Sequence, residues 1–596
     1  MGYRIGVDVG GSFTDFAVMS DDMGELYTLK VYSRPDAPGE EIAEAFRILH
    51  ERHGISPSAI TYFNHGTTVG INTVIQRNGM KLALFTTRGF EDVLEMGRLK
   101  VPHIHDLFSR RAEPLIPRER VFGIDERMNA QGGTVTPVDP ASVAAAVQAA
   151  RRAGAQAIVV AFLHSYRNEA HERRVCELIH EISPDLPAFG AADIWPVIRE
   201  YERTITATIN GYVQPRVAHY LDRFEQTLLA LGIAAPLRIT KSNGGIMGAA
   251  QARAECVQMI LSGTASGVMG AAYIARSCSF DKILSLDIGG TSADIATIID
   301  GNPEYSVGEI IGDFQIHIPS VSVTSIGQGG GSIAWVDTHD VLHVGPESAG
   351  STPGPACYGR GGMQPTLTDA MAVCGLLGHA PLGYNAVHLD CGAAQAAMRP
   401  LAGRLHASIE AVAQSIIELA VSGMYTDASA VISRFGIDQR DYYIMAFGGA
   451  GPMAACFLAR ALEMKGVIVP PAPGVLSALG GLIAGLRNDF IRILYMDVHA
   501  GNAGAIGAAF DALEARARHW LHEEQGHAGT SVVSCVAEMR YQGQSFEVVT
   551  DIDPQWIASR DMAAMRDAFH ARHHQLFGHR DDDAIVQVIN LRLMIE

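Results

Sequence analysis

Short apolar runs separated by turn residues open the chain. Residues 3–9 and 13–19 are rich in apolar residues, and a third such run covers 25–32 after a turn at 21–24. Runs of this length, bounded by turn residues, are typical of β-strands. We therefore expect three consecutive strands that form an antiparallel meander.

Beyond the meander the hydrophobic period changes to that of a helix. Ile42, Ala45, Phe46 and Leu49 share one face of a predicted helix over 39–53. Strand-like and helix-like segments then alternate, which is typical of an α/β fold. The expected strands cover 60–64, 81–86 and 157–163, and the expected helices start near Thr68, run through Leu94 and start again near Ala141.

The pattern changes again near residue 500, where an amphipathic helix is followed by strand-like runs at 532–541, 546–549 and 585–594. This arrangement predicts a small α+β module at the C-terminal end. A chain of 596 residues has the length of about four ordinary domains, or of three large ones. We expect an N-terminal unit over 1–198, a second unit over 199–495 and the C-terminal module over 496–596.

One apolar stretch, residues 467–486, has the length of a membrane span. Prolines and glycines interrupt it, so a buried loop followed by a core helix is expected instead. The first residues lack a basic segment ahead of an apolar one, which favours a cytoplasmic protein without a leader. These features predict no membrane partner.

The composition narrows the functional classes. Lys and Arg total 46 against 64 Asp and Glu, a formal charge of −18, which opposes a nucleic acid as the main partner. The eight cysteines include no CxxC pair, so neither a zinc knuckle nor a disulfide framework is indicated. The 62 glycines provide for many turns and close backbone approaches.

An internal repeat is the most informative feature of the sequence. Residues 5–18, IGVDVGGSFTDFAV, recur at 284–297 as LSLDIGGTSADIAT, 279 positions later. The repeat aligns Asp8 with Asp287 and predicts two lobes with related cores. Further aligned pairs are Gly10 with Gly289, Gly11 with Gly290, Ser12 with Thr291, and Asp15 with Asp294.

Each copy suits a metal–nucleotide site. The paired glycines let backbone N–H groups approach phosphate oxygens, the hydroxyl adds a donor, and the aspartate can hold Mg²⁺ through water. For a single copy, a plain hairpin turn capped by the aspartate is the alternative. Strand-like sequence follows each copy, unlike the helix that follows a P-loop or a dinucleotide-binding turn.

A third glycine-rich turn, 447–452, follows the apolar run 442–446 and precedes a helical stretch at 453–462. Further segments of defined sequence extend over nearly the whole chain. They are RIGVDVGGSFTDF (4–16), NHGTTVGIN (64–72), TTRGFEDVLEMGR (86–98), REYERT (199–204), KSNGG (241–245), LDIGGTSADIA (286–296), GQGGGSIAWVD (327–337), VGPESAGSTPGPACYGRGG (344–362), PTLTDA (365–370), AFGGAGPM (446–453), VPPAPGVLSALG (469–480) and RYQGQSFE (540–547).

Two such hairpins and the later turn resemble the nucleotide-binding elements of the actin-like ATPase superfamily. The full set resembles one branch more closely, the hydantoinase A and 5-oxoprolinase family, together with related subunits of acetone and acetophenone carboxylases. Departures from that pattern are Ser12 for threonine, Ala293 for threonine, and LSGTASGV at 261–268 for a proline-containing LSGPAAGV.

The resemblance implies an α/β, two-lobed actin-like (ribonuclease H-like) fold that binds ATP with Mg²⁺, Mn²⁺ or another divalent ion between its lobes. It implies transfer of the γ-phosphoryl group to the carbonyl oxygen of a cyclic amide (a hydantoin, 5-oxoproline or a lactam) to drive ring opening. It also implies a partner subunit of the hydantoinase B type in a hetero-oligomer. A ketone carboxylase subunit and a nucleotide-gated binding protein are the alternatives.

The expected site residues fall into three groups. Asp8 and Asp287 are the metal holders and, with Asp294 and His65, the expected catalytic residues. His65 precedes a predicted helix start, so a substrate or phosphate contact and a buried structural histidine are both open. The expected nucleotide contacts are Gly10, Gly11, Ser12, Thr14, Gly289, Gly290, Thr291, Ser292, Gly448, Gly449, Ala450 and Gly451.

Two other features, a candidate metal cluster and a cysteine, each allow a functional or a purely structural interpretation. His103, His105 and Asp106 form a metal-like cluster, or a solvated loop beside a cleft. Cys357 has the identity of a nucleophile, but no basic residue stands beside it, so a structural role is expected.

Overall fold

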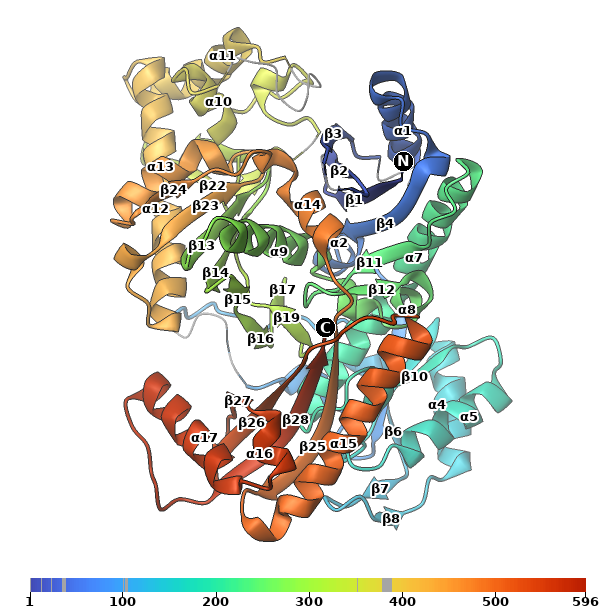
Figure 1. The fold of residues 1–596 in the computed structure, drawn as a ribbon. Helices are drawn as coiled ribbons and strands as arrows, with labels where there is room; N and C mark the ends of the chain where they lie inside the picture. Colours follow the sequence, from blue (N-terminus) through green and yellow to red (C-terminus); the bar gives the residue numbers. More distant parts are fainter. Residues whose placement is uncertain are drawn as a thin grey trace.

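The computed structural model describes residues 2–11, 13–22, 24–34, 39–99, 101, 105–350, 352–377 and 388–596. It confirms a mixed α/β fold (Figure 1). Ser12 and His103 lie outside the described residues.

The first large sheet has six strands in the order β12-β11-β4-β1-β2-β3. The expected antiparallel meander of β1, β2 and β3 is confirmed, and β1, β4 and β11 run parallel. Their bounds are β1 Tyr3–Val9, β2 Phe13–Ser20, β3 Leu26–Tyr32, β4 Ile60–Thr67, β11 Leu237–Thr240 and β12 Ile246–Gly248, and the covering helices are α1 Glu40–His53, α2 Val69–Ile75, α7 Glu200–Ala230 and α8 Ala249–Ala254. Because β11 and β12 pair into this sheet, it extends across the boundary expected at residue 198.

The second large sheet repeats the arrangement around β13. An antiparallel partner, β14, lies on one side of β13, and a parallel one, β23, lies on the other, as β2 and β4 flank β1. The bounds are β13 Lys282–Ile288, β14 Ala293–Ile299, β15 Asn302–Pro303, β20 Thr324–Ile326, β23 Tyr443–Phe447 and β24 Gly466–Ile468, with α10 Leu367–Val373, α11 Cys391–Arg404, α12 Ile409–Phe435 and α13 Gly451–Ala461. Thus the sequence repeat corresponds to a repeated strand order.

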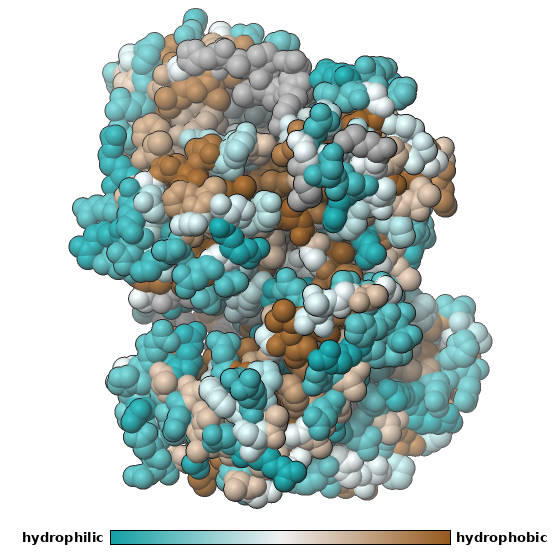
Figure 2. Space-filling model, viewed as in Figure 1, coloured by the Kyte–Doolittle hydropathy of each residue, from teal (hydrophilic) through white to brown (hydrophobic). Residues whose placement is uncertain are grey.

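Helices α9 (Ser262–Ser277) and α14 (Leu476–Ile483) lie between the two large sheets (Figure 1). A Cβ atom on Gly6 of β1 would lie 2.1 Å from the carbonyl oxygen of Ala478, and one on Gly480 would lie 1.8 Å from that of Ser266. Only glycine permits these approaches. The loop and core helix expected within 467–486 are confirmed, and Figure 2 shows hydrophobic side chains gathered along this line between the sheets.

A third, smaller sheet has the order β10-β9-β5-β6 and its own hydrophobic core. The strands expected near 81–86 and 157–163 belong to it, and not to the first sheet. Its bounds are β5 Leu82–Thr87, β6 Val121–Ile124, β9 Ala157–Ala161 and β10 Ala188–Gly190, with α4 Pro140–Arg152 and α5 Ala170–Ile182. This unit stands between α2 and α7 in the chain.

The C-terminal sheet is antiparallel, in the order β25-β28-β26-β27, and encloses a further core with α15 and α17. Strand β25 crosses the boundary expected at 496, because it pairs along its length with β28. The bounds are β25 Asn488–Asp497, β26 Val533–Tyr541, β27 Val548–Ile552, β28 Val586–Ile595, α15 Ala503–His519, α16 Pro554–Ala558 and α17 Met562–Phe577.

The remaining short elements connect these units. They are α3 Val93–Met96, α6 Ala191–Ile194, β7 Arg127–Met128, β8 Thr134–Thr136, β16 Tyr305–Val307, β17 Ile310–Ile311, β18 Phe314–Gln315, β19 Pro319–Val321, β21 Ser332–Val336 and β22 Leu342–Ser348. Among the described residues, no helix is long and apolar enough to cross a membrane.

Candidate functional site

The two repeated hairpins have the same geometry. Asp8 lies opposite Asp15 in the β1–β2 ladder, and Asp287 lies opposite Asp294 in the β13–β14 ladder. Each turn is closed by the same kind of backbone bond, 3.0 Å in both: Gly10 N–H donates to the Phe13 carbonyl and Gly289 N–H to that of Ser292. The duplication of sequence is therefore a duplication of turn structure.

Asp8 is tightly enclosed by backbone. A Cβ atom on Gly66 would lie 3.2 Å from its Oδ1, and one on Gly263 would lie 3.0 Å from it. Within the part of the chain that the structure describes, this buried oxygen has no hydrogen-bond partner. Burial, with the nearby Asp15 charge, raises the pKa of Asp8 to about 7 against the opposing effect of Lys30.

Asp287 belongs to the same charge cluster, although it stands in the other sheet. Burial raises its pKa to about 8, and the charges of Asp294, Asp8 and Asp15 add to the effect. The charges of Asp8 and Asp15 in the first hairpin contribute to this shift, so the two hairpins interact electrostatically. Asp8, Asp287 and Asp294 thus influence one another's charge, and their roles in metal binding and catalysis stay predictions.

Helix α9 stands between the two carboxylates. A Cβ on Gly263 would approach Asp8, and a Cβ on Gly267, one turn further, would lie 3.4 Å from Oδ2 of Asp287. Thr264 donates to Oδ2 of Asp294 at 3.1 Å. In the sequence this segment stands out as a departure from a family pattern, and its small residues at helical spacing are a signal of close packing.

The segment 329–331 braces the second hairpin. The N–H groups of Gly330 and Gly331 donate to the carbonyls of Gly289 and Gly290 at 3.0 and 2.6 Å. A Cβ on Gly329 would lie 2.7 Å from the amide nitrogen of Ser292. The N–H groups of Gly330 and Gly331 are therefore already hydrogen-bonded to the second hairpin. Segment 329–331 covers the outer side of that hairpin.

The third turn joins the second hairpin to the loop before α14. Ala450 N–H donates to the Ile288 carbonyl at 2.9 Å, and Gly448 N–H donates to that of Pro473 at 3.0 Å. Gly448 has φ +79°, and a Cβ there would lie 2.2 Å from Oδ1 of Asp287. A Cβ on Gly449, in contrast, would meet no described atom within 4 Å, so this position borders open space.

Thr14 and His65 differ from expectation. Thr14 is fully buried, and its hydroxyl shares a 3.0 Å hydrogen bond with Ser33, which in turn donates to the Gly10 carbonyl at 2.7 Å. Because side chains alternate along a strand, Thr14 points away from the face of its neighbour Asp15. Thr14 therefore supports the turn from behind.

The side chains of His65 and Asp8 lie on opposite faces of the first sheet, because His65 pairs with Val7, the neighbour of Asp8. Nε2 of His65 lies 2.5 Å from the Tyr220 hydroxyl and its ring packs edge-on against Phe224, both on α7. Burial lowers the pKa of His65 to about 4, so the ring is neutral at pH 7. Of the two open interpretations, the geometry favours the buried structural histidine.

Neither secondary candidate gains support. His105 is exposed, and among the described residues no three His, Cys, Asp or Glu side chains are placed to hold one metal ion. Cys357 is buried, and burial together with Asp369 raises the pKa of its thiol. A thiol held protonated in this way is a poor nucleophile.

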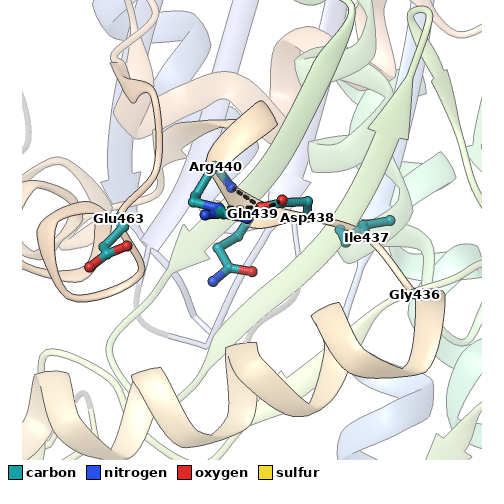
Figure 3. A pocket seen from close by; sticks show the side chains of 6 residues that line it. All are labelled: Gly436, Ile437, Asp438, Gln439, Arg440 and Glu463. Carbon is teal, nitrogen blue, oxygen red and sulfur yellow. Dashed lines mark hydrogen bonds and ion pairs between the residues drawn. The ribbon is translucent and has the colours of Figure 1, made fainter.

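A shallow surface pocket of about 500 Å³ lies elsewhere (Figure 3). It precedes the amino end of β23, whereas Gly448 follows the carboxyl end. In parallel α/β sheets ligands bind at the carboxyl ends of strands, so this pocket is not the candidate nucleotide site. Its lining residues are Gly436, Ile437, Asp438, Gln439, Arg440 and Glu463.

Motifs far apart in the sequence meet where the C-terminal sheet contacts the rest of the molecule. Arg199 of REYERT forms a 2.7 Å ion pair with Glu547 of RYQGQSFE. Asn243 of KSNGG donates to Asp489 at 2.5 Å. These motifs therefore fasten β25 and the β26–β27 connection to the N-terminal part, a role that the sequence did not reveal.

Comparisons with known proteins place the chain in one family. Residues 4–183 match the model of the hydantoinase/oxoprolinase N-terminal region, and residues 203–490 match that of hydantoinase/oxoprolinase. The chain belongs to the hydantoinase/oxoprolinase family, which confirms the resemblance seen in the sequence.

Particular relatives extend this result. The chain is 32% identical to caprolactamase subunit alpha of Pseudomonas jessenii over all of its own length and 86% of that protein. It is 30% identical to the acetophenone carboxylase gamma subunit of Aromatoleum aromaticum, covering 91% of this chain and 77% of the relative.

Two solved structures are similar over almost the whole chain. The structure of ATP-dependent caprolactamase from Pseudomonas jessenii has a TM-score of 0.86 at 31% identity, covering 99% of this chain and 87% of that one. Nucleotide-free acetone carboxylase has a TM-score of 0.81 at 26% identity, covering 100% and 88%.

Proposed function

We propose that this chain is the ATP-using subunit of an enzyme that opens a cyclic amide, and that it binds ATP between two actin-like lobes. One observation carries the proposal: Asp8 and Asp287, each preceding a glycine turn, approach helix α9 from two sheets at Gly263 and Gly267, one helical turn apart. Membership of a family that includes an ATP-dependent caprolactamase supports it.

Mg²⁺, or Mn²⁺, would be held by Asp8 and Asp287. The donor set fits, because Oδ1 of Asp8 is buried without a hydrogen-bond partner among the described residues. Mg²⁺ usually keeps several waters and phosphate ligands and needs only one or two carboxylates. When bound, the ion would supply positive charge to the phosphate oxygens.

The glycine turns would bind the nucleotide. Gly11 and Gly449 border open space, so backbone N–H groups there are accessible to a ligand. We assign the triphosphate to the turns at Gly10–Gly11 and Gly289–Ser292, and the adenosine to the turn 448–451. Ser12, which lies outside the described residues, remains a predicted contact.

The reaction that fits this arrangement begins with transfer of the γ-phosphoryl group to the amide oxygen, which forms an imidate phosphate and ADP. Water then adds to the former carbonyl carbon. The ring C–N bond breaks, the nitrogen leaves with a proton as an amine, and an acyl phosphate remains. A second water hydrolyses this to a carboxylate and phosphate. The protein chiefly aligns the reactants and neutralises charge.

We further propose that a hydantoinase B-type subunit completes ring opening. The relatives reported above are themselves named as subunits, which supports a hetero-oligomer. The phosphoryl transfer assigned to this chain accounts for its two hairpins. Residues of the C-terminal module then serve for packing or docking.

A subunit of an ATP-dependent ketone carboxylase is the second candidate. The similarity to acetone carboxylase, at a TM-score of 0.81, favours it. In that reaction an enol phosphate takes the place of the imidate phosphate. The same hairpins would serve either reaction, so the products distinguish them.

The test is a screen of lactams, hydantoins, 5-oxoproline and ketones with bicarbonate for stimulated ADP formation, with and without a B-type subunit. We expect stimulation by a cyclic amide, and ring-opened product only with the partner. Carboxylated product from a ketone would replace the first candidate by the second. Stoichiometric ring opening by the isolated chain would overturn the division between subunits.

A further inference from the structure

Lys30 is a cation beside the aspartates of the two hairpins. It lies on β3 directly opposite Asp15 of β2, and its ammonium group forms an ion pair with Oδ1 of that residue. The two side chains are only 13% and 15% exposed. A largely desolvated ammonium group requires a charged or strongly polar partner.

The surroundings of Lys30 belong to both lobes. A Cβ atom on Gly474 would lie 4.0 Å from Cε of Lys30, so the loop before α14 packs on its stem. The neighbouring Pro473 accepts the hydrogen bond from Gly448, at the turn assigned to adenosine. Lys30 therefore lies where the first hairpin approaches the loop that is hydrogen-bonded to the third turn.

The positive charge of Lys30 affects the pKa of a carboxylate in each hairpin. Burial raises the pKa of Asp8 and of Asp287, and Lys30 opposes that rise at each. Asp8, Asp15, Asp287 and Asp294 together would repel a triphosphate. A nucleotide that enters here needs positive charge from the protein as well as from a metal ion.

We propose that Lys30 is a phosphate-binding residue, whose ammonium group leaves Asp15 and donates to a triphosphate oxygen when ATP binds. The proposal rests on the proposed function. The four-carbon stem of lysine has three donors and allows such an exchange of partners. In the absence of nucleotide, Asp15 keeps the ammonium group of Lys30 paired and in position.

The experiment is calorimetric titration of the full chain with a non-hydrolysable ATP analogue and, separately, with adenosine. We expect Lys30→Met to weaken analogue binding roughly 10- to 100-fold, since a charge-assisted hydrogen bond is lost, and to leave adenosine binding unchanged. Asp15→Asn removes the competing carboxylate and should raise analogue affinity several-fold. Lys282→Met is the matched control, because Lys282 forms an exposed ion pair with Asp441.

The outcomes separate the two proposals. If the wild-type chain fails to bind the analogue, the proposed function falls. If it binds and Lys30→Met binds equally well, the role of Lys30 is overturned while the function stands. Equal losses in Lys30→Met and Asp15→Asn would show a purely structural ion pair and also overturn it.

A double variant covers the case in which Lys30→Met does not fold because Asp15 is left unpaired. Lys30→Met with Asp15→Asn removes both charges, so its fold should persist and thermal unfolding should report it. We expect this variant to keep the loss of analogue affinity. Wild-type affinity in the double variant would overturn the proposal.

Discussion

The two hairpins share a backbone and differ in how the second aspartate of each is held. Asp15 is paired with the ammonium group of Lys30, whereas Asp294 accepts hydrogen bonds from the hydroxyls of Thr264 and Ser325. A cation can exchange its partner for a phosphate, but neutral hydroxyls from α9 and β20 hold the carboxylate in place. The duplicated turn thus carries one adaptable and one fixed acidic residue.

The hairpins also differ in what supports them. Thr14 and Ser33 support the first turn from within its own sheet. The second turn is braced by the separate segment 329–331, whose backbone stacks directly on it. A repeat in sequence therefore produced the same turn twice, but in unlike surroundings.

Breaking the brace of the second hairpin should have the largest effect. Gly329→Val would push a side chain into the backbone at Thr291 and Ser292, at a cost of about 1–3 kcal/mol or more in stability. We expect loss of measurable binding of the ATP analogue. Gly327→Val is the control, because a Cβ at Gly327 meets no described atom within 4 Å. Equal binding by both variants would contradict the brace.

Removing the first aspartate of either hairpin tests whether the two large sheets contribute to one site. Asp8→Asn and Asp287→Asn should each lower ATP hydrolysis roughly 100-fold or more, as expected for loss of a group that places charge at the reacting centre. Asp441→Asn, at an exposed ion pair, should have no effect. Wild-type rates in both hairpin variants would remove these residues from the site.

The open side of the third turn allows a graded test. Gly449→Ala and Gly449→Val extend increasing volume into the space beside Gly449, so affinity for the analogue should fall by about tenfold with valine, equivalent to about 1.4 kcal/mol. Thermal unfolding should be unchanged, since nothing described is displaced. Unaltered affinity in the valine variant would place the nucleotide elsewhere.

The smallest expected effect comes from one position at which the two large sheets differ. Val7 pairs with His65 in the first sheet, and its repeat equivalent Leu286 pairs with Ala446 in the second. The pKa of His65 is lowered to about 4 by burial. Between that value and its unfolded pKa of about 6.5 the unfolded chain binds a proton that the folded chain excludes, so stability falls as the pH falls.

We expect a loss of about 1 kcal/mol from this residue between pH 7 and 5.5. Denaturant unfolding of wild type and His65→Gln at both pH values measures the difference. The variant should be less stable at pH 7 but should show a smaller change with pH. An identical change in both proteins would contradict a neutral, buried His65.

Several features were predictable from local pattern. The meander, the core helix within 467–486 and the acidic pairs follow from runs of apolar residues and from the repeat. The pairing of Asp15 with Lys30 was also predictable from the sequence, because a turn centred within 21–24 places these two residues opposite one another. In contrast, the face occupied by His65 depends on the register between β1 and β4, strands more than fifty residues apart.

The sequence alone determined that two aspartate–glycine turns end buried strands, and that the chain has the motifs of its family, because these are local properties of residue type and spacing. Tertiary structure decided that Asp8 and Asp287 share one charge cluster, that α9 separates them by a helical turn, and that Thr14 and His65 point away from it. These outcomes depend on strand register and on backbone approaches between segments hundreds of residues apart, which local pattern does not encode.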